Sequence, residues 1–150
     1  ELDGGSGAQW LSWAAQLHEI GLDISHDRYH HHGAYIAEHA DIPGFSRQEQ
    51  RLLACLIRAH RRKFPVKLFK ELPAGGAGMF QQLAVLLRLA VLLHRGRVPA
   101  AAPAFELQAD KRRLALSFPA GWLDQHPLTR ADLAQEAGYL QAAGFELTFA

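Results

Sequence analysis

The stretch SRQEQRLLACLIRAH, residues 46–60, decides the fold of this 150-residue chain. Ser46 and Glu49 form a capping-box pattern, in which each side chain can accept a hydrogen bond from the other residue's backbone N–H at a helix start. The apolar residues that follow recur at helical spacing and make one stripe, which comprises Leu52, Leu53, Leu56, Ile57 and Phe64. His60 falls on the same stripe, so we expect a buried helix with an imidazole in its apolar face.

Helical periodicity continues on both sides of this stretch. Upstream, the apolar pattern predicts one helix over residues 8–20, ended by Gly21, and a second from about residue 33 to residue 40. Downstream, residues 79–94 are so uniformly hydrophobic that we expect a helix surrounded by other helices. Its apolar run contains Arg88 and is shorter than the roughly 20 residues that cross a bilayer, so we expect no membrane span.

The tail of the chain has a different period. A segment rich in proline and alanine separates a helical domain over residues 1–98 from a small α/β domain over residues 104–150. Two alternating stretches, 105–109 and 114–118, flank a turn and predict a pair of antiparallel strands. A helical pattern and a third strand over 145–149 follow. The predicted fold class is mostly α, with a small β-β-α-β domain at the C-terminal end.

The composition excludes several classes of protein. A formal net charge of +1 gives no overall attraction for a polyanion, so such binding needs a local cluster of positive groups. The single cysteine, Cys55, excludes an internal disulfide and Cys-rich zinc motifs, which fits a reducing compartment, and we expect a cytoplasmic protein. No signal-peptide pattern follows Glu1, and we expect the chain to be a fragment of a longer protein.

Two clusters of positive or titratable residues point to anion binding. Six basic residues lie within 13 consecutive positions that contain no acidic residue: Arg58, Arg61, Arg62, Lys63, Lys67 and Lys70. The electrostatic field of these residues attracts a polyanion, and arginine can form bidentate hydrogen bonds with phosphate. The alternative is that the cluster only complements the dipole of its own helix. Residues 30–32 are three histidines before the helix expected from residue 33, whose free N–H groups favour an anion. The wider histidine cluster could instead be a weak transition-metal site or a solvated loop edge; its members are His26, His30, His31, His32 and His39.

A third group of residues has the skeleton of a metal site. His18 and Glu19 stand together at a predicted helix end, and His60 faces the same core from another helix. Divalent ions bind imidazole and carboxylate groups together, so these three residues are candidate ligands. The alternative is that both histidines are hydrogen-bonded core residues and that Glu19 is exposed.

Five segments carry a more specific pattern: WAAQLHEIGL (13–22), YHHHGAYI (29–36), DIPGF (41–45), IRAHRRK (57–63) and LRLAVLL (87–93). They resemble the exopolyphosphatase / guanosine pentaphosphate phosphohydrolase family. The strand pairs and FPAGWL (118–123) resemble the extreme C-terminus of that family, so the resemblance covers nearly the whole chain. The resemblance implies a catalytic site in N-terminal actin-like domains that bind Mg²⁺ and cleave terminal phosphates. Those domains are absent from this sequence, so it implies no catalytic residue and no cofactor here.

The part of the family that the chain resembles implies a degenerate HD-type metal phosphohydrolase domain followed by a small α/β domain. Against the HD pattern, His18 matches the motif histidine, Glu19 replaces its aspartate and His60 matches a later histidine. Val91 stands where the last aspartate belongs, and a hydrocarbon cannot coordinate a metal. The ligand set is therefore incomplete.

The leading hypothesis is a non-catalytic module that binds long-chain inorganic polyphosphate. The residues expected to line the anion path are His30, His31, His32, Arg58, His60, Arg61, Arg62 and Lys63. Its further expected partners are its own N-terminal catalytic domains and a second copy in a homodimer. The alternatives are a residual HD-type metal-dependent phosphohydrolase site, a nucleic-acid-binding module and a purely structural module.

Overall fold

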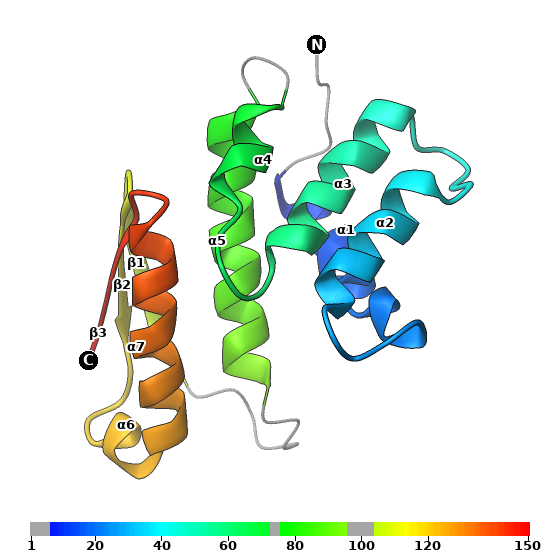
Figure 1. Ribbon diagram of the computed structural model, residues 1–150. Coiled ribbons are helices and arrows are strands. Elements are labelled where there is room, and N and C mark those ends of the chain that lie inside the picture. The colour runs from blue at the N-terminus through cyan, green and yellow to red at the C-terminus, as the bar shows by residue number, and fades with distance from the viewer. Residues whose placement is uncertain (1–6, 73–75, 96–103) are drawn as a thin grey trace. The chain divides into compact units, whose positions relative to one another are not determined.

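Helix α3 (Arg47–Ala59) begins at the capping box that the sequence predicts (Figure 1). The computed structural model describes residues 7–72, 76–95 and 104–150. In it the Ser46 hydroxyl accepts a hydrogen bond from the Glu49 backbone N–H at 3.1 Å, and the Ser46 N–H donates to the Glu49 carboxylate at 3.0 Å. The buried side chains of α3 include Leu52, Leu53, Leu56 and Ile57, so the apolar stripe is confirmed at these positions.

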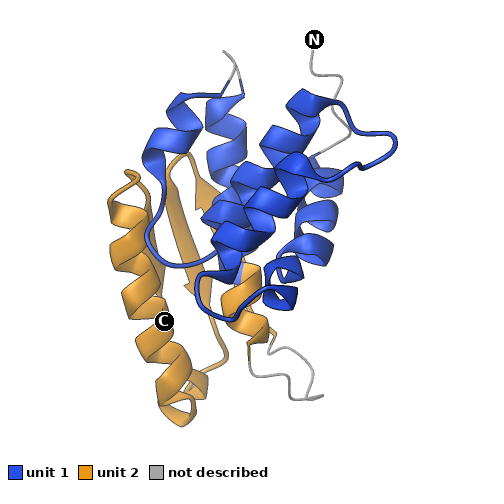
Figure 2. Cartoon of the chain, turned by 45° about the vertical axis from the view of Figure 1, so that its right-hand side comes forward, with its two compact units in different colours: residues 1–89 blue, residues 90–150 orange. Residues whose placement is uncertain are grey.

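The chain divides into two compact units, residues 1–89 and 90–150, which Figure 2 shows in different colours. The elements of the first unit are α1 (Gly7–Leu17), the 3-10 helix η1 (Ile20–Asp23), α2 (Tyr29–His39), α3, α4 (Val66–Lys70) and most of α5 (Ala77–His94). The predicted domain boundary between residues 98 and 104 falls within 96–103, which lie outside the described residues, so it stays a prediction.

Helix α5 supplies apolar side chains to the core of the first unit. Phe80, Ala84 and Leu87 are buried, and Trp10 of α1 meets Phe80 edge to face with ring centroids 5.3 Å apart. By length and composition alone α5 is apolar enough to cross a membrane, but half of that stretch is buried inside the protein. Core helices pass the same composition test, and this burial supports the expectation of a core helix.

One charged residue of α5 is almost fully buried. Arg88 is 1% exposed, and its guanidinium donates to the carbonyl oxygens of Ala59 at 2.6 Å and of Arg62 at 2.5 Å. Carbonyls at a helix end lack intrahelical donors, and Arg88 supplies one to Ala59 at the end of α3. Arg88 therefore fixes the backbone that leaves α3.

Helix α3 ends earlier than the sequence pattern suggests. It stops at Ala59, so His60, Arg62 and Phe64 leave the helix in which the sequence placed them. The φ angle of Arg62 is 63°, a left-handed conformation that breaks the helical path, and the proline at position 65 disfavours helix at Phe64. His60 and Phe64 are nevertheless buried, with 2% and 3% of their surface exposed.

Helix α2 begins at Tyr29, so the prediction that residues 30–32 precede the helix is wrong. The three histidines lie in its first turn instead. Arg28 forms the N-cap with a left-handed backbone (φ 52°), and its carbonyl accepts the first hydrogen bonds of the helix. The anion-favouring helix start therefore lies at Arg28 and Tyr29.

Gly33 lies inside α2, whereas the sequence suggested that it marks the start of this helix. A glycine at this position permits close packing within the unit. A Cβ on Gly33 would lie 3.0 Å from Ile57 Cγ2 and 3.4 Å from the backbone nitrogen of Gly21. A Cβ on Gly21 would overlap the carbonyl oxygen of Tyr29. The two glycines thus let the backbones of η1 and α2 approach each other directly, and Gly33 leaves room for the Ile57 side chain of α3.

The second unit contains the predicted β-β-α-β arrangement. Its described elements are β1 (Glu106–Asp110), β2 (Arg113–Ser117), α6 (Trp122–Gln125), α7 (Pro127–Gln141) and β3 (Glu146–Phe149). The strand order is β1-β2-β3, with β1 and β2 antiparallel and β2 and β3 parallel. Leu116 and Leu147 are buried on the sheet, and Leu133 and Leu140 are buried on α7. The fold class, mostly α with a small α/β part, is confirmed.

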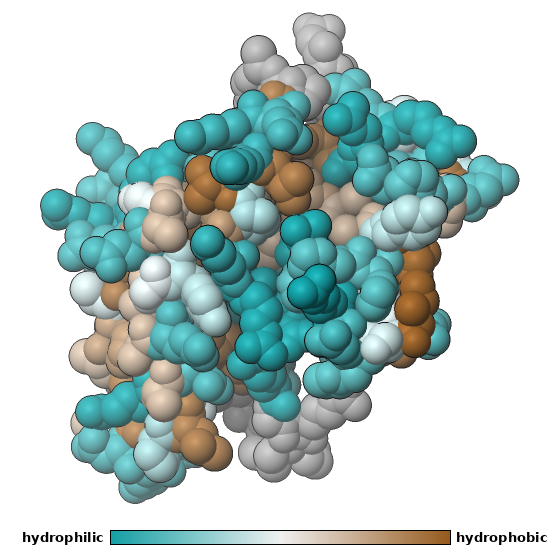
Figure 3. All heavy atoms as spheres, viewed as in Figure 1, coloured by the Kyte–Doolittle hydropathy of each residue, from teal (hydrophilic) through white to brown (hydrophobic). Residues whose placement is uncertain are grey.

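Hydrophilic residues predominate on the face of the molecule in Figure 3, and hydrophobic residues appear there in small separate groups. The exposed large apolar side chains include Ile24, which follows η1, Tyr35 of α2 and Leu128 of α7. Scattered exposed apolar residues are normal on a protein surface.

Candidate anion-binding site

Basic side chains converge on a pocket at the start of α2. The pocket has a volume of about 440 Å³, and the residues that line it are His26, Asp27, Arg28, His30, His31, Arg61 and Arg62. The loop before α2 and its first turn supply one wall, and the segment after α3 supplies the other. Three guanidinium groups face a single carboxylate, so the pocket has an excess of positive charge that favours an anionic ligand.

Two of the three arginines have a left-handed backbone. The φ angles of Arg28 and Arg62 are 52° and 63°, a conformation that costs a non-glycine residue roughly 1–3 kcal/mol. The Arg28 carbonyl accepts hydrogen bonds from His31 and His32 at 2.9 and 3.2 Å, and Arg88 holds the Arg62 carbonyl. Strained residues that are held in this way are enriched at functional sites, although Lys111 (φ 54°) has the same conformation in the turn between β1 and β2.

His30 is the buried member of the pocket. Its side chain is 7% exposed, and its Nδ1 has no hydrogen-bond partner among the described residues. Burial, followed by the positive charges of His31, Arg61, Arg58 and Arg62, lowers the pKa of His30 to about 4. The imidazole is therefore neutral at pH 7.

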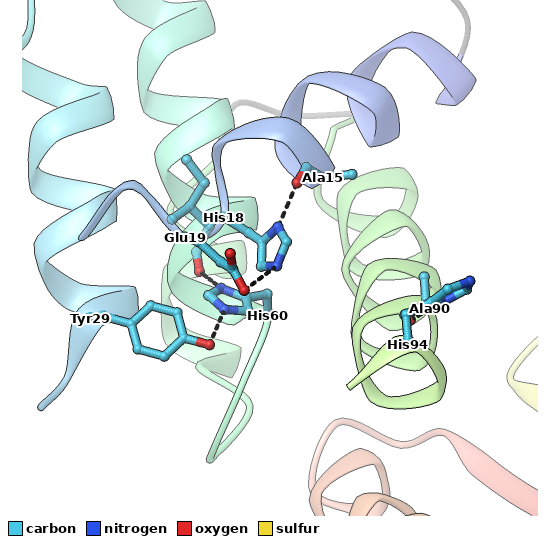
Figure 4. A network of polar contacts seen from close by, with 8 residues as sticks. Ala15, His18, Glu19, Tyr29, His60, Ala90 and His94 are labelled. Atoms are coloured by element: carbon cyan, nitrogen blue, oxygen red, sulfur yellow. Dashed lines mark hydrogen bonds and ion pairs between the residues drawn. The ribbon is translucent and has the colours of Figure 1, made fainter. Parts of the chain in front are cut away.

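Arg61 is positioned by a chain of contacts that leads into the core. Its guanidinium carbon lies 4.3 Å from the centroid of the Tyr29 ring, and the Tyr29 hydroxyl lies 3.4 Å from His60 Nε2 (Figure 4). His60 Nδ1 donates to the Ile57 carbonyl at 2.5 Å. Burial lowers the pKa of His60 to about 3, so the ring is neutral and its Nε2 accepts from Tyr29. His60 thus orients Tyr29, on which Arg61 rests.

The pocket brings together four of the eight residues predicted to bind polyphosphate, namely His30, His31, Arg61 and Arg62. The other four are not among its lining residues, and their role as ligands stays a prediction: His32, Arg58, His60 and Lys63. The sequence reasoning missed Arg28. Its position next to a run of histidines was an available signal, because a basic residue there adds to the same local field.

The metal-site hypothesis for His18, Glu19 and His60 has partial geometric support. The two imidazole rings lie 5.1 Å apart between centroids, and His18 Nε2 is 3.7 Å from the Glu19 carboxylate (Figure 4). Both ring nitrogens of His60 already have hydrogen-bond partners. Within the described ranges, no group of three His, Cys, Asp or Glu residues is placed to hold a metal ion. This donor set does not fit a complete metal site, and metal binding by these residues stays a prediction.

Acid is expected to destabilise the helical unit. The pKa values of His30 and His60 are lowered from 6.5 to about 4 and about 3, so below pH 6.5 the unfolded chain binds more protons than the folded one. The free energy of unfolding should therefore fall as the pH falls from 6.5 through the folded pKa values, by at most about 1.4 kcal/mol per pH unit for each histidine. Urea denaturation at a series of pH values measures this slope. His60→Gln should flatten it, whereas a flat profile for the unmodified chain would show that neither histidine is held neutral.

The fold and the pocket together define a mostly helical module with a small α/β tail and a basic pocket at a helix start. The model of domain III of the Ppx/GppA phosphatases matches residues 2–137, and the chain belongs to this family. The resemblance inferred from the sequence is thereby confirmed.

Several curated relatives share the name guanosine-5'-triphosphate,3'-diphosphate pyrophosphatase. The relative from Aeromonas hydrophila subsp. hydrophila is 36% identical over 135 residues, which cover 90% of this chain and 27% of that protein. The relative from Pseudoalteromonas atlantica is 34% identical over 148 residues, with 99% and 29% covered. The relative from Vibrio cholerae serotype O1 is 37% identical over 138 residues, with 92% and 27% covered. The chain thus spans between 27% and 29% of the length of these relatives.

Proposed function

We propose that this chain is an accessory part of a Ppx/GppA-type phosphohydrolase and that its basic pocket binds the phosphate groups of long-chain inorganic polyphosphate. The convergence of Arg28, Arg61 and Arg62 around the buried His30 is the observation that carries this proposal. Guanidinium groups bind phosphate oxygens through charge-assisted, often bidentate, hydrogen bonds. A bound phosphate also neutralises the charges that lower the pKa of His30.

A phosphorylated guanosine is the second candidate ligand, because the curated relatives carry such a substrate in their names. It shares its phosphate groups with polyphosphate but brings a ribose and a base. Both ligands should compete for the same arginines. Long polyphosphate has the advantage that further basic residues near the pocket, such as Arg58 and Lys63, can engage the same chain.

In the longer protein we propose that catalysis belongs to N-terminal domains that bind Mg²⁺, while this chain contributes substrate binding and subunit contact in a cytoplasmic homodimer. The chain covers little more than a quarter of the relatives' length, which leaves ample room for such domains elsewhere. The proposal therefore assigns no catalytic residue to this chain.

Polyphosphate binding is expected to weaken steeply with salt and to depend on the pocket. Each phosphate that an arginine neutralises releases counterions, as in nucleic-acid binding. Arg61→Ala/Arg62→Ala removes two charge-assisted contacts and should weaken binding by about 10- to 100-fold at low salt. Anisotropy titrations of labelled long-chain polyphosphate over a series of salt concentrations measure both effects.

A matched control separates the pocket from overall charge. Lys67→Ala/Lys70→Ala also removes two positive charges, but from exposed positions on α4 that do not line the pocket. This double variant should weaken polyphosphate binding much less than Arg61→Ala/Arg62→Ala. Equal losses in both double variants, or salt-insensitive binding by the unmodified chain, would contradict the proposal. Single-stranded RNA that competes as well as polyphosphate would instead favour a nucleic-acid-binding module.

A further inference from the structure

The helical unit has a second pocket where α2, α3 and α4 meet, with a volume of about 190 Å³. Its floor is apolar. Ala54 and Cys55 of α3 are 5% and 6% exposed, and Ala34, Leu68 and Leu72 complete the floor. Ligand pockets for drug-sized molecules measure roughly 300–1,000 Å³, so this one suits a smaller molecule with an apolar body.

Four charged side chains surround this floor, two of each sign: Arg51 and Arg58 of α3, Glu38 of α2 and Glu71 at the end of α4. The two arginines are seven residues apart on one helix, which separates them by about 10 Å along its axis. None of the four side chains forms an ion pair with another residue that the structure describes. The pocket therefore offers unpaired positive and negative groups together.

At one end of the pocket, Glu38 lies close to Arg51 in the fold. Gln50 Nε2 donates to the carbonyl oxygens of Ala37 and Ala40 at 3.1 and 2.6 Å, which ties the end of α2 to the start of α3. Glu38 lies between these two carbonyls in sequence, and Arg51 directly follows Gln50. This end therefore presents an anion and a cation.

Nearer the other end, Arg58 and Glu71 both act on the thiol of Cys55. Burial raises the pKa of Cys55 to about 12, Arg58 acts to lower it and Glu71 acts to raise it. The two charges are thus close enough to the same floor residue to influence its ionisation in opposite directions. This end also presents one group of each sign.

We infer that this pocket binds a small zwitterion of the amino-acid type with an apolar body. The ligand's carboxylate meets an arginine, its ammonium group meets a glutamate, and its apolar body covers the floor. Polyphosphate is unsuited because Glu38 and Glu71 repel it, and a hydrocarbon is unsuited because it leaves the four charges at the rim without a partner. This site has a different lining from the proposed phosphate pocket, although Arg58 also acts electrostatically on His30 and His31 of that pocket. The inference does not rest on the proposed function.

Three probes with the same branched body distinguish zwitterion recognition from simpler binding. They are L-leucine, 4-methylpentanoate, which lacks the ammonium group, and 3-methylbutylamine, which lacks the carboxylate. Cys55 is the only cysteine of the chain, and its buried, protonated thiol is alkylated only slowly. The ratio of its slow alkylation rates with and without ligand reports whether its pocket is occupied. Leucine at about 10 mM should slow alkylation several-fold, and each analogue should need at least about 10-fold more ligand for the same effect.

Variants test the assignment of the charges. Arg51→Gln and Glu71→Gln should each weaken protection by leucine about 10-fold, whereas Arg47→Gln, exposed on the same helix outside the pocket, should not change it. Ala34→Leu fills the floor without removing a charge and should abolish protection, with circular dichroism to verify the fold. Absence of protection by leucine, or equal protection by 4-methylpentanoate, would overturn the inference and leave the polyphosphate result unaffected.

Discussion

Replacing Gly21 by alanine is expected to destabilise the helical unit by about 4 kcal/mol or more, which is a large part of the stability of a typical protein. A Cβ on Gly21 would overlap the Tyr29 carbonyl oxygen and lie 2.6 Å from the backbone nitrogen of Gly33. Backbone atoms cannot move aside as the end of a flexible side chain can. The 3-10 helix η1 would therefore have to leave the start of α2, and polyphosphate binding should be lost together with stability.

Gly78→Ala is the matched control for this prediction. Gly78 also lies in a helix, but nothing lies within 4 Å of the position that its Cβ would take. That substitution should be neutral or stabilise the chain by up to about 1 kcal/mol, because alanine is the better helix former. Urea denaturation followed by circular dichroism compares the two variants. A loss below about 1 kcal/mol for Gly21→Ala would mean that the backbones do not approach as closely as described.

Arg88→Met is expected to cost about 3–5 kcal/mol of stability. Methionine has a comparable length but no donor, so the Ala59 and Arg62 carbonyls lose the hydrogen bonds that Arg88 donates inside the protein. Arg62 should then lose its fixed left-handed conformation. Polyphosphate affinity should fall even under conditions in which the variant remains folded, and this second readout distinguishes a positioning role from a purely structural one.

Arg88→Lys and Arg47→Met complete this test. Lysine keeps the charge but not the planar fork, so it should recover only part of the lost stability. Arg47 is exposed at the start of α3, and its replacement should change stability by no more than about 0.5 kcal/mol. A loss in Arg88→Met as small as that in Arg47→Met would mean that the buried guanidinium contributes no net stability, which is the outcome for some buried charges.

The parts of the fold that the sequence predicted are those in which one element's own residues decide the structure. The capping box of Ser46 and Glu49 set the start of α3, and strict alternation predicted the hairpin of β1 and β2. Helices α4 and α6 have five and four residues, too few to show a period. The early start of α2 depends on the left-handed Arg28, a backbone conformation that an arginine rarely adopts and that its residue type does not predict.

The candidate site was predictable only in part for the same reason. The sequence placed His18 and His60 in one core, and their rings are indeed 5.1 Å apart. The sequence did not predict that Arg28 and Arg61 line the same pocket, because their proximity depends on how the loop before α2 packs against the segment after α3. The pocket with both positive and negative side chains could not be predicted from the sequence either, since its two arginines and two glutamates come from separate segments.

The parallel pairing of β2 with β3 has a consequence for synthesis of the chain. The hairpin of β1 and β2 can form as soon as both strands leave the ribosome, because hairpins close within microseconds. Strand β3 can join β2 only after both α6 and α7 have emerged. Throughout that interval the far side of β2 is an open strand edge, which can pair with a neighbouring nascent chain. The tail therefore presents an aggregation-prone strand edge while the chain is being made.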